Sequence, residues 1–440
     1  MDARLSALLA VDNPWLEDPE RKPDAFAGRV PSTPVPRHVP GLERWPVARH
    51  AHLVVGPRRA GKTTLIWLWC RSRGQPPLLL NAEEPAIREW SASPALAARD
   101  LEALVGPEVP ILLDEAQRLP EAGLFVKGLI DRALPNPLFV TGSSSFHLLA
   151  KTRESLAGRA VRAVLHPFSL AELGATLPPA PAALKALRLR ELALRHAVVG
   201  GYPDAWLAAE PRPVLEHLVE GVVLRDASDF FRVQHLDAFH KLLRLVAGQV
   251  GSLVNLSEWA GICGVARATI AGYLDLLVET HLVHLVTPFV GGRRAEVTGR
   301  PKVFVVDGGV RGVLVNALQP FDDRPDRGPV LENWVAGELL KRQPALLGPG
   351  LRYWRSTSGA EVDFVLAGDD GLTGVEVKAT PLHRPALSRS ARSFIDAYRP
   401  GQFVVVNLAL EHEETLGATR VRWVGPEWLA GPLEDYALKE

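Results

Sequence analysis

The feature that most constrains this chain is the stretch at residues 56–64, which reads Gly-Pro-Arg-Arg-Ala-Gly-Lys-Thr-Thr. Apolar runs lie on both sides of it, at residues 53–55 and 65–69, so the pattern predicts a strand, a glycine-rich loop and a helix start. Its two glycines let the backbone curl around an anion, so that successive N–H groups and the helix N-terminus face a phosphate. The alternative is an ordinary turn before a helix.

The predicted nucleotide-binding loop comprises nine residues: Gly56, Pro57, Arg58, Arg59, Ala60, Gly61, Lys62, Thr63 and Thr64. The lysine is placed to reach the β- and γ-phosphates of ATP, and the threonine that follows it can offer its hydroxyl to Mg²⁺. ATP and Mg²⁺ are therefore the expected ligands.

Residues 46–165 alternate apolar, strand-like runs with helical stretches. This alternation favours an α/β fold in which a parallel sheet is covered by helices on both faces. The expected strands contain residues 53–55, 78–81, 111–115, 138–142 and 163–165.

The third of these runs ends in Asp114 and Glu115, at the carboxyl end of a strand, where ligands of parallel α/β sheets bind. We expect Asp114 to hold Mg²⁺ through water, and Glu115 to orient or deprotonate the attacking water. The fourth run ends in Thr-Gly-Ser-Ser-Ser at 141–145, and its hydroxyls, including Ser143, are candidates for sensing the γ-phosphate. The alternative is a serine-rich cap for the next helix.

Two arginines close to the fifth run are candidates for an arginine finger that enters the site of a neighbouring subunit. Arg159 is the first candidate and Arg162 the second, and the alternative is a plain surface arginine.

These segments, together with Glu-Ser-Leu-Ala-Gly-Arg at 154–159, resemble the AAA-type ATPases that carry a C-terminal DUF4143 domain. The resemblance continues at 166–169, at 200–203 and at the Arg-Asp pair 225–226. It implies ATP hydrolysis in a homo-oligomer, for which a hexameric ring is one arrangement, with nucleotide between subunits and a helical lid over 166–235. It also suggests that 200–203 borders the nucleotide.

Residues 236–300 resemble a winged helix-turn-helix, with helices near 256–260 and 266–274 and wing strands at 282–286 and 302–306. If this module binds DNA, its second helix enters the major groove and its basic wing contacts phosphate. The alternative is a helical module for subunit contacts. The candidate DNA contacts are Arg267, Thr269, Arg293, Arg294 and Arg300.

Residues 301–440 resemble restriction-endonuclease-like PD-(D/E)XK domains, because Asp363 precedes a Glu-x-Lys motif formed by Glu376 and Lys378. Strand alternation places Glu376 and Lys378 on one face, and an antiparallel neighbour can bring Asp363 beside them. The two carboxylates would bind Mg²⁺ while Lys378 activates water, and Glu332 resembles the family's additional acidic ligand. The alternative is a site that only binds a nucleic-acid backbone.

Lysine plus arginine and aspartate plus glutamate balance at 50 each, so any nucleic-acid surface must be local. Two cysteines exclude a disulfide framework, and no signal sequence or membrane span is evident, so we expect a cytoplasmic protein without membrane contact. The predicted division is an N-terminal lead-in (1–45), ATPase core (46–165), lid (166–235), winged helix (236–300) and α/β nuclease-like domain (301–440).

The function predicted from these parts is a DNA-dependent ATPase motor or remodeller, such as a helicase or a branch-migration enzyme. Two alternatives remain: a nucleotide-switched regulatory ATPase, and an ATPase that licenses a Mg²⁺-dependent nuclease.

Overall fold

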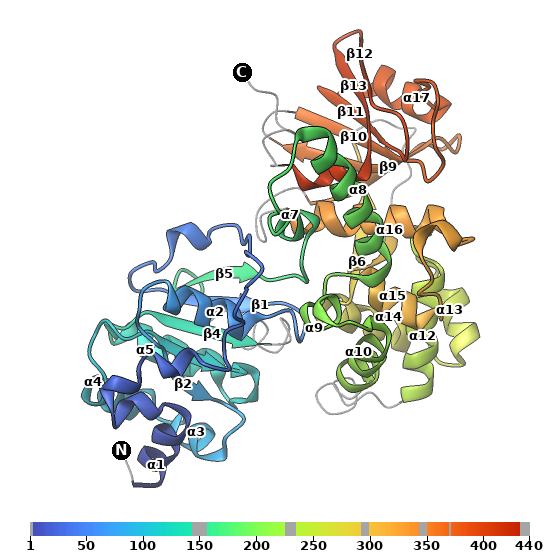
Figure 1. Cartoon of the computed structure of the whole chain (residues 1–440). Coiled ribbons are helices and arrows are strands. Elements are labelled where there is room, and N and C mark those ends of the chain that lie inside the picture. The colour runs from blue at the N-terminus through green and yellow to red at the C-terminus, as the bar shows by residue number, and fades with distance from the viewer. Residues whose placement is uncertain are drawn as a thin grey trace. The chain divides into compact units, whose positions relative to one another are not determined.

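The structure is a computed structural model that describes residues 3–142, 156–224, 235–291, 299–342, 350–368 and 371–431. The chain separates into two compact units, residues 1–166 and 167–440 (Figure 1). The finer division into five parts remains a prediction.

The first unit contains a five-stranded sheet with the strand order β2-β3-β4-β1-β5, and every pair in it is parallel. The parallel α/β sheet predicted from the apolar runs is therefore confirmed. Each run forms one strand: β1 (Ala51–Val55), β2 (Leu78–Asn81), β3 (Ile111–Asp114), β4 (Leu138–Gly142) and β5 (Ala160–Val164).

Helices cover both faces of this sheet. Successive residues of a strand point to opposite faces, so neighbouring residues of β1 pack against different helices. On β1, Leu53 and Val55 pack with α1, α3, α4 and α5, whereas Val54 packs with α2 and the segment around Trp45. The N-terminal residues therefore belong to this unit, and Trp15 and Trp45 are buried in it. The helices are α1 (Ala3–Asp12), α2 (Lys62–Arg71), α3 (Pro85–Trp90), α4 (Pro94–Leu104) and α5 (Ala122–Asp131).

The second unit begins with helices and continues into an eight-stranded mixed sheet ordered β12-β13-β11-β10-β9-β8-β6-β7. Its helices are α7 (Leu170–Gly174), α8 (Ala182–Val199), α9 (Pro203–Leu207), α10 (Pro211–Leu218), a π-helix (Val219–Leu224), α12 (Leu236–Gly248), α13 (Leu256–Cys263), α14 (Arg267–Glu279), α15 (Gly308–Leu314), α16 (Arg327–Lys341) and α17 (Arg389–Tyr398). Its strands are β6 (Val283–Pro288), β7 (Lys302–Val305), β8 (Arg352–Arg355), β9 (Glu361–Gly368), β10 (Gly371–Val377), β11 (Gln402–Val406), β12 (His412–Leu416) and β13 (Thr419–Val424).

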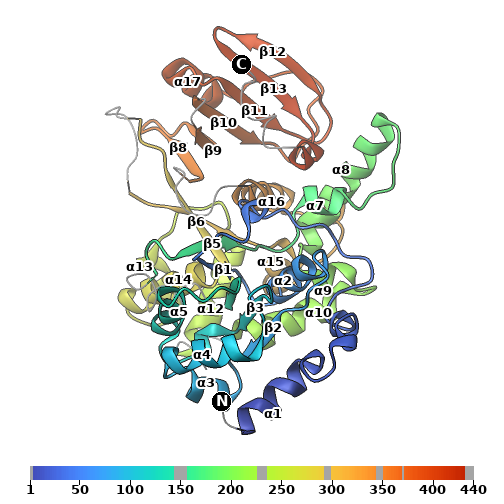
Figure 2. The same ribbon diagram turned by 90° about the vertical axis from the view of Figure 1, so that its left-hand side faces the viewer.

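Two helices cover the two faces of this larger sheet (Figure 2). On β11, Val404 packs with α16, while its neighbours Phe403 and Val405 pack with α17. The sheet also joins strands of the predicted winged helix-turn-helix to strands of the predicted nuclease-like domain. The β6–β7 hairpin is antiparallel, and Thr287 and Pro288 at the end of β6 pair with β8.

Helices α13 and α14 form a bent pair whose axes turn by 103° at a short break. This angle lies within the range of helix-turn-helix units. Trp259 on α13 and Ile270 on α14 are buried in one cluster with Phe239 of α12. Within the described ranges no single helix has the length and apolarity needed to cross a membrane, although this bent pair reaches both when its helices are counted together.

Candidate nucleotide-binding site

The loop between β1 and α2 has a backbone that requires glycine at its two ends. Gly56 has φ 143°, and a Cβ atom there would lie 2.1 Å from the carbonyl oxygen of Leu165. Gly61, with φ 93°, is the left-handed N-cap of α2. Both glycines of the motif are therefore needed for a turn that directs the N-terminus of α2 into the loop.

The two polar residues that open α2 lie where the sequence predicts them. The Lys62 ammonium is buried and donates hydrogen bonds to the carbonyls of Gly56 (3.1 Å) and Pro57 (2.9 Å). The Thr63 hydroxyl donates to both carboxylate oxygens of Asp114, at 3.0 and 3.1 Å. The loop lysine and the loop threonine thus lie at the carboxyl edge of the sheet.

This donor set fits Mg²⁺ bound together with a nucleotide. Mg²⁺ takes oxygen ligands and is usually held by one or two protein groups plus phosphate and water. The Thr63 hydroxyl and the Asp114 carboxylate are such a pair. No group of three or more His, Cys, Asp or Glu residues in the described part of the chain could hold a metal alone. The residues therefore fit a metal that arrives with its nucleotide.

Thr141, the penultimate residue of β4, connects Asp114, the last residue of β3, to Glu115, which follows it. Its hydroxyl donates to Asp114, and it accepts a hydrogen bond from the backbone N–H of Glu115 at 3.3 Å. The adjacent register of the strands, with Leu113 opposite Val140, produces this contact. The sequence pointed to the hydroxyl run 141–145 without singling out Thr141, and Ser143 lies outside the described residues.

Glu115 has an unusual backbone for a residue with a side chain, because its φ is 53°. Such left-handed conformations persist where the surroundings hold them, and they are frequent at active sites. The Gln117 amide donates a hydrogen bond to the Glu115 carboxylate. Sequence reasoning missed Gln117 as a contact of Glu115, although it belongs to the quoted Asp-Glu-Ala-Gln segment.

Arg37, from the N-terminal lead-in, also reaches the loop. Its guanidinium donates to the carbonyl of Ala60 at 2.9 Å and to the carbonyl of His166 at 2.5 Å. No motif marks this arginine, and the sequence analysis did not identify it.

The two arginine-finger candidates lie on and beside β5. Arg159 forms an ion pair with Asp131 of its own chain at 2.5 Å, with 37% of its side chain exposed. Arg162 lies within β5, opposite Leu53 of β1. An arginine finger would have to exchange this ion pair for a phosphate in the neighbouring subunit, and that role remains a prediction.

The four residues predicted as a nuclease-like site do come together in the second unit. The β9–β10 register pairs Phe364 with Val375, so Asp363 lies beside Glu376, and Asp363 accepts a hydrogen bond from Val377 N at 2.8 Å. The Lys378 ammonium lies 2.7 Å from the Glu376 carboxylate.

A residue that the sequence analysis missed, Lys302 of β7, lies among these acids. Its buried ammonium is 3.2 Å from Glu332 and 2.5 Å from Glu361. Burial disfavours its charged form, but the surrounding carboxylates outweigh that effect and raise the pKa of Lys302. Burial and the Glu332 charge raise the pKa of Asp363 to about 7, although Lys302 opposes them. The cluster therefore contains its own cation.

The candidate DNA contacts are only partly described. Arg267 and Thr269 lie in the first turn of α14, where Arg267 is exposed, and Arg300 is exposed just before β7. Arg293 and Arg294 lie outside the described residues, as does the Arg-Asp pair at 225–226.

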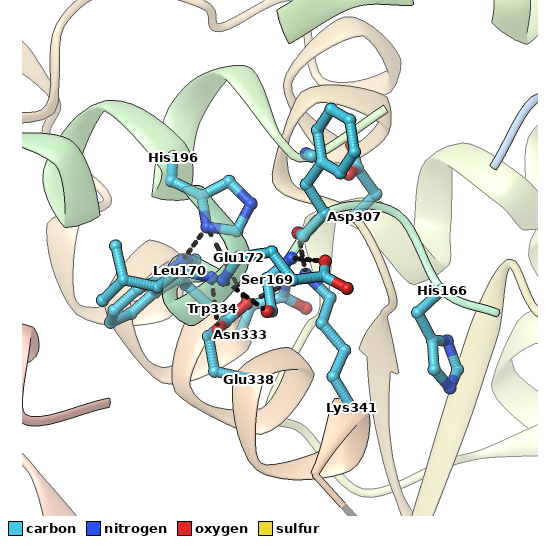
Figure 3. A network of polar contacts seen from close by, with 12 residues as sticks. His166, Ser169, Leu170, Glu172, His196, Asp307, Asn333, Trp334, Glu338 and Lys341 are labelled. Atoms are coloured by element: carbon cyan, nitrogen blue, oxygen red, sulfur yellow. Dashed lines mark hydrogen bonds and ion pairs between the residues drawn. The ribbon is translucent and has the colours of Figure 1, made fainter. Parts of the chain in front are cut away.

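Two segments that carry part of the family resemblance, 166–169 and 200–203, contribute to a buried polar network. Figure 3 shows Ser169, Glu172, His196, Asp307, Glu338 and Lys341 of this network. Gly201 N donates to Asp307 at 2.7 Å, and Lys341 donates to the Phe168 carbonyl at 2.8 Å and to Glu338 at 2.9 Å. Burial and the nearby Lys341 charge lower the pKa of His196 to about 3, so its imidazole is neutral. Leu170 N also donates to Glu338 at 2.8 Å, and the Trp334 indole N–H donates to His196 at 2.9 Å, so the network joins α7 and α8 to α16.

A parallel sheet with a glycine-rich phosphate loop, and with an acidic strand end beside the loop threonine, is typical of P-loop nucleotide-binding domains. The sequence matches the AAA domain family over residues 48–174. It also matches two domains of unknown function, DUF8612 over residues 190–320 and DUF4143 over residues 327–423.

The chain belongs to the same family as the uncharacterized protein Rv2008c of Mycobacterium tuberculosis and the uncharacterized protein Mb2031c of Mycobacterium bovis. It is 30% identical to each over 359 residues, which span 80% of this chain and 74% of the relative. The uncharacterized protein MJ1544 of Methanocaldococcus jannaschii is 20% identical over 331 residues, or 72% of each chain.

Two solved structures show weaker similarity. The Aeropyrum pernix Orc1 protein, solved in complex with DNA, is 18% identical with a TM-score of 0.26, covering 61% of this chain and 86% of its own. The Thermotoga maritima RuvB Holliday junction branch migration motor is 17% identical with a TM-score of 0.24, covering 54% and 82%. Scores this low carry no conclusion about function.

Proposed function

We propose that this protein binds and hydrolyses ATP at the loop between β1 and α2. The observation that carries the proposal is the hydrogen-bonded chain from Thr63 through Asp114 and Thr141 to the backbone of Glu115. It links the loop to the acidic strand end, which supports a shared site for phosphate, metal and water at this edge of the sheet.

Each residue then has a distinct task. The backbone N–H groups of the loop and the N-terminus of α2 bind phosphate oxygens, and the Lys62 ammonium adds positive charge there. Thr63 and Asp114 would hold Mg²⁺, which supplies charge neutralisation of the phosphates when bound. The Glu115 carboxylate orients or deprotonates the attacking water, and Gln117 holds that carboxylate in place.

The test is the rate of phosphate release by the purified full chain. We expect Lys62→Ala to abolish nucleotide binding, and Glu115→Gln to retain binding while lowering turnover by about 100-fold or more. Glu89→Gln, which changes an exposed glutamate of α3, is the matched control and should leave the rate unchanged. Turnover that survives Lys62→Ala would contradict the proposal.

We further propose that the ATPase works on DNA through α13 and α14, as a motor or remodeller of a homo-oligomer. The 103° bend of this helix pair and the exposed Arg267 at the start of α14 support this reading. ATPase rates should rise with single-stranded, duplex or branched DNA, and the rise should weaken steeply with salt. Arg267→Ala should reduce the stimulation. An ATPase that is indifferent to all three DNAs and binds none would support a nucleotide-switched regulator instead.

A nuclease is the second candidate, because Glu332, Asp363, Glu376 and Lys378 do gather in one place. The internal ammonium of Lys302 already offsets part of their charge, which weighs against a metal there. Mg²⁺-dependent cleavage that Asp363→Ala abolishes and Glu115→Gln leaves intact would establish the nuclease. If none of the three DNAs is cleaved, the cluster of Glu332, Asp363, Glu376 and Lys378 has a structural role instead.

A further inference from the structure

We propose that Arg37 is a positioning residue that couples the phosphate loop to the connector leading into the second unit. The inference rests on the proposed ATPase function and adds a route by which nucleotide binding reaches this connector, residues 164–170. Arg37 acts through hydrogen bonds to two backbone carbonyls, those of Ala60 and His166.

The first step is the bridge that Arg37 makes. One guanidinium donates through Nη1 to the carbonyl of Ala60 and through Nη2 to the carbonyl of His166. Ala60 lies in the phosphate loop, directly before Gly61, and His166 is the last residue of the first unit. A planar, forked guanidinium fixes the positions of two acceptors relative to each other, which a single ammonium does less well.

The second step is that the other end of the loop touches the same connector. The Leu165 carbonyl lies so close to Gly56 that a Cβ atom on this glycine would be 2.1 Å away, and Leu165 N donates to the Val55 carbonyl at 2.8 Å. The start of the loop is therefore packed against residue 165, while its later part is tied to residue 166 through Arg37. Both contacts would transmit a displacement of the loop.

The third step is that the segment carrying Arg37 is itself anchored. Val39 and Trp45 are buried against the face of the sheet that α2 covers. An arginine on a fixed segment holds its two acceptors in place, whereas one on a free segment would follow either of them. A nucleotide that displaces the Ala60 carbonyl would therefore displace the His166 carbonyl through the Arg37 guanidinium.

The experiment is hydrogen–deuterium exchange of the full chain, with and without a non-hydrolysable ATP analogue and Mg²⁺. In the wild type we expect the analogue to alter exchange both in the loop (56–64) and in the connector (164–170). Arg37→Met should keep the analogue Kd within about tenfold of wild type, and keep the loop response, but lose most of the connector response. Arg37→Lys should give an intermediate connector response.

Arg29→Met is the matched control, because Arg29 belongs to the same lead-in and also donates to a backbone carbonyl, that of Asp12, at 3.1 Å. Its guanidinium lies over the Trp67 ring, away from the loop carbonyls that Arg37 binds. This variant should respond as the wild type does. Unchanged exchange in β2 and α4 of each variant would show that the first unit remains folded.

Three outcomes would overturn the inference. A full connector response in Arg37→Met, with the analogue bound, shows that Arg37 is not the link. A full response in Arg37→Lys shows that charge suffices without the two-carbonyl bridge. Failure of the wild type to bind the analogue refutes the proposed ATPase function, and this inference falls with it, so the two failures are distinguishable.

Discussion

Replacing Lys302 with methionine should destabilise the second unit strongly, because it removes the internal cation of the acidic cluster. The Lys302 side chain is 4% exposed and forms ion pairs with Glu332 at 3.2 Å and Glu361 at 2.5 Å. Removing one partner of a buried pair costs roughly 3–5 kcal/mol, because the remaining charges lose their compensation. Since the two carboxylates are 22% and 29% exposed, we expect the lower end, about 3 kcal/mol.

The loss should depend on pH in a defined direction. An acid whose folded pKa is raised stabilises the fold at low pH and loses that contribution as the pH rises through the folded pKa. Asp363 already has its pKa raised to about 7 and the pKa of Glu332 is also raised, and removing Lys302, which opposes both shifts, raises these two pKa values further. The cost of Lys302→Met should therefore be largest above neutral pH and should shrink as the solution is acidified.

The assay is urea unfolding followed by tryptophan fluorescence, with hydrogen exchange in α16 to assign the transition to the second unit. Arg212→Met on α10 is the matched control, because this arginine is 49% exposed and its partner Glu216 is 47% exposed. Exposed pairs contribute about 0–1 kcal/mol, so its loss should be small. The reasoning fails if both variants lose equal stability, or if the cost of Lys302→Met grows toward low pH.

Three further predictions concern single positions. Gly56→Ala should lower the unfolding free energy of the first unit by at least about 2 kcal/mol and abolish ATP binding, because φ is 143° and the new Cβ would meet the Leu165 carbonyl. Thermal unfolding and equilibrium binding measure the two effects, and a neutral result would contradict the loop geometry. Thr141→Val should lower kcat about 10-fold or more with little change in KM, whereas Thr141→Ser should retain activity, because only serine keeps the hydroxyl that donates to Asp114. Equal kcat values for the two variants would show that this hydroxyl is not needed for turnover. Asp363→Asn should reduce the fall in unfolding free energy between about pH 4 and pH 7, because a carboxyl group with a raised folded pKa contributes its full stabilisation only below that range. Urea unfolding at a series of pH values measures this, and an unchanged dependence of the unfolding free energy on pH would refute the assignment.

The features that the sequence predicted correctly are local ones. The strand–loop–helix at the phosphate loop depends on apolar runs and on two glycines whose backbone angles other residues rarely adopt. The position of Asp114 at a strand end follows from the run of three apolar residues that precedes it. In the C-terminal part, a hairpin with the correct register was enough to bring Asp363 beside Glu376.

What the sequence could not determine are the partners of these residues across the fold. Thr141 reaches Asp114 across 27 positions, Lys302 reaches Glu332 across 30, and Arg37 reaches His166 across 129. None of these contacts has a motif, because they depend on strand order and on how segments pack over the sheet. Backbone preference and apolar periodicity are encoded within a few residues, and they determined the phosphate loop and its strands. Only the tertiary structure decided which hydroxyl meets the acidic strand end, which lysine balances the carboxylates and which arginine ties the loop to the connector.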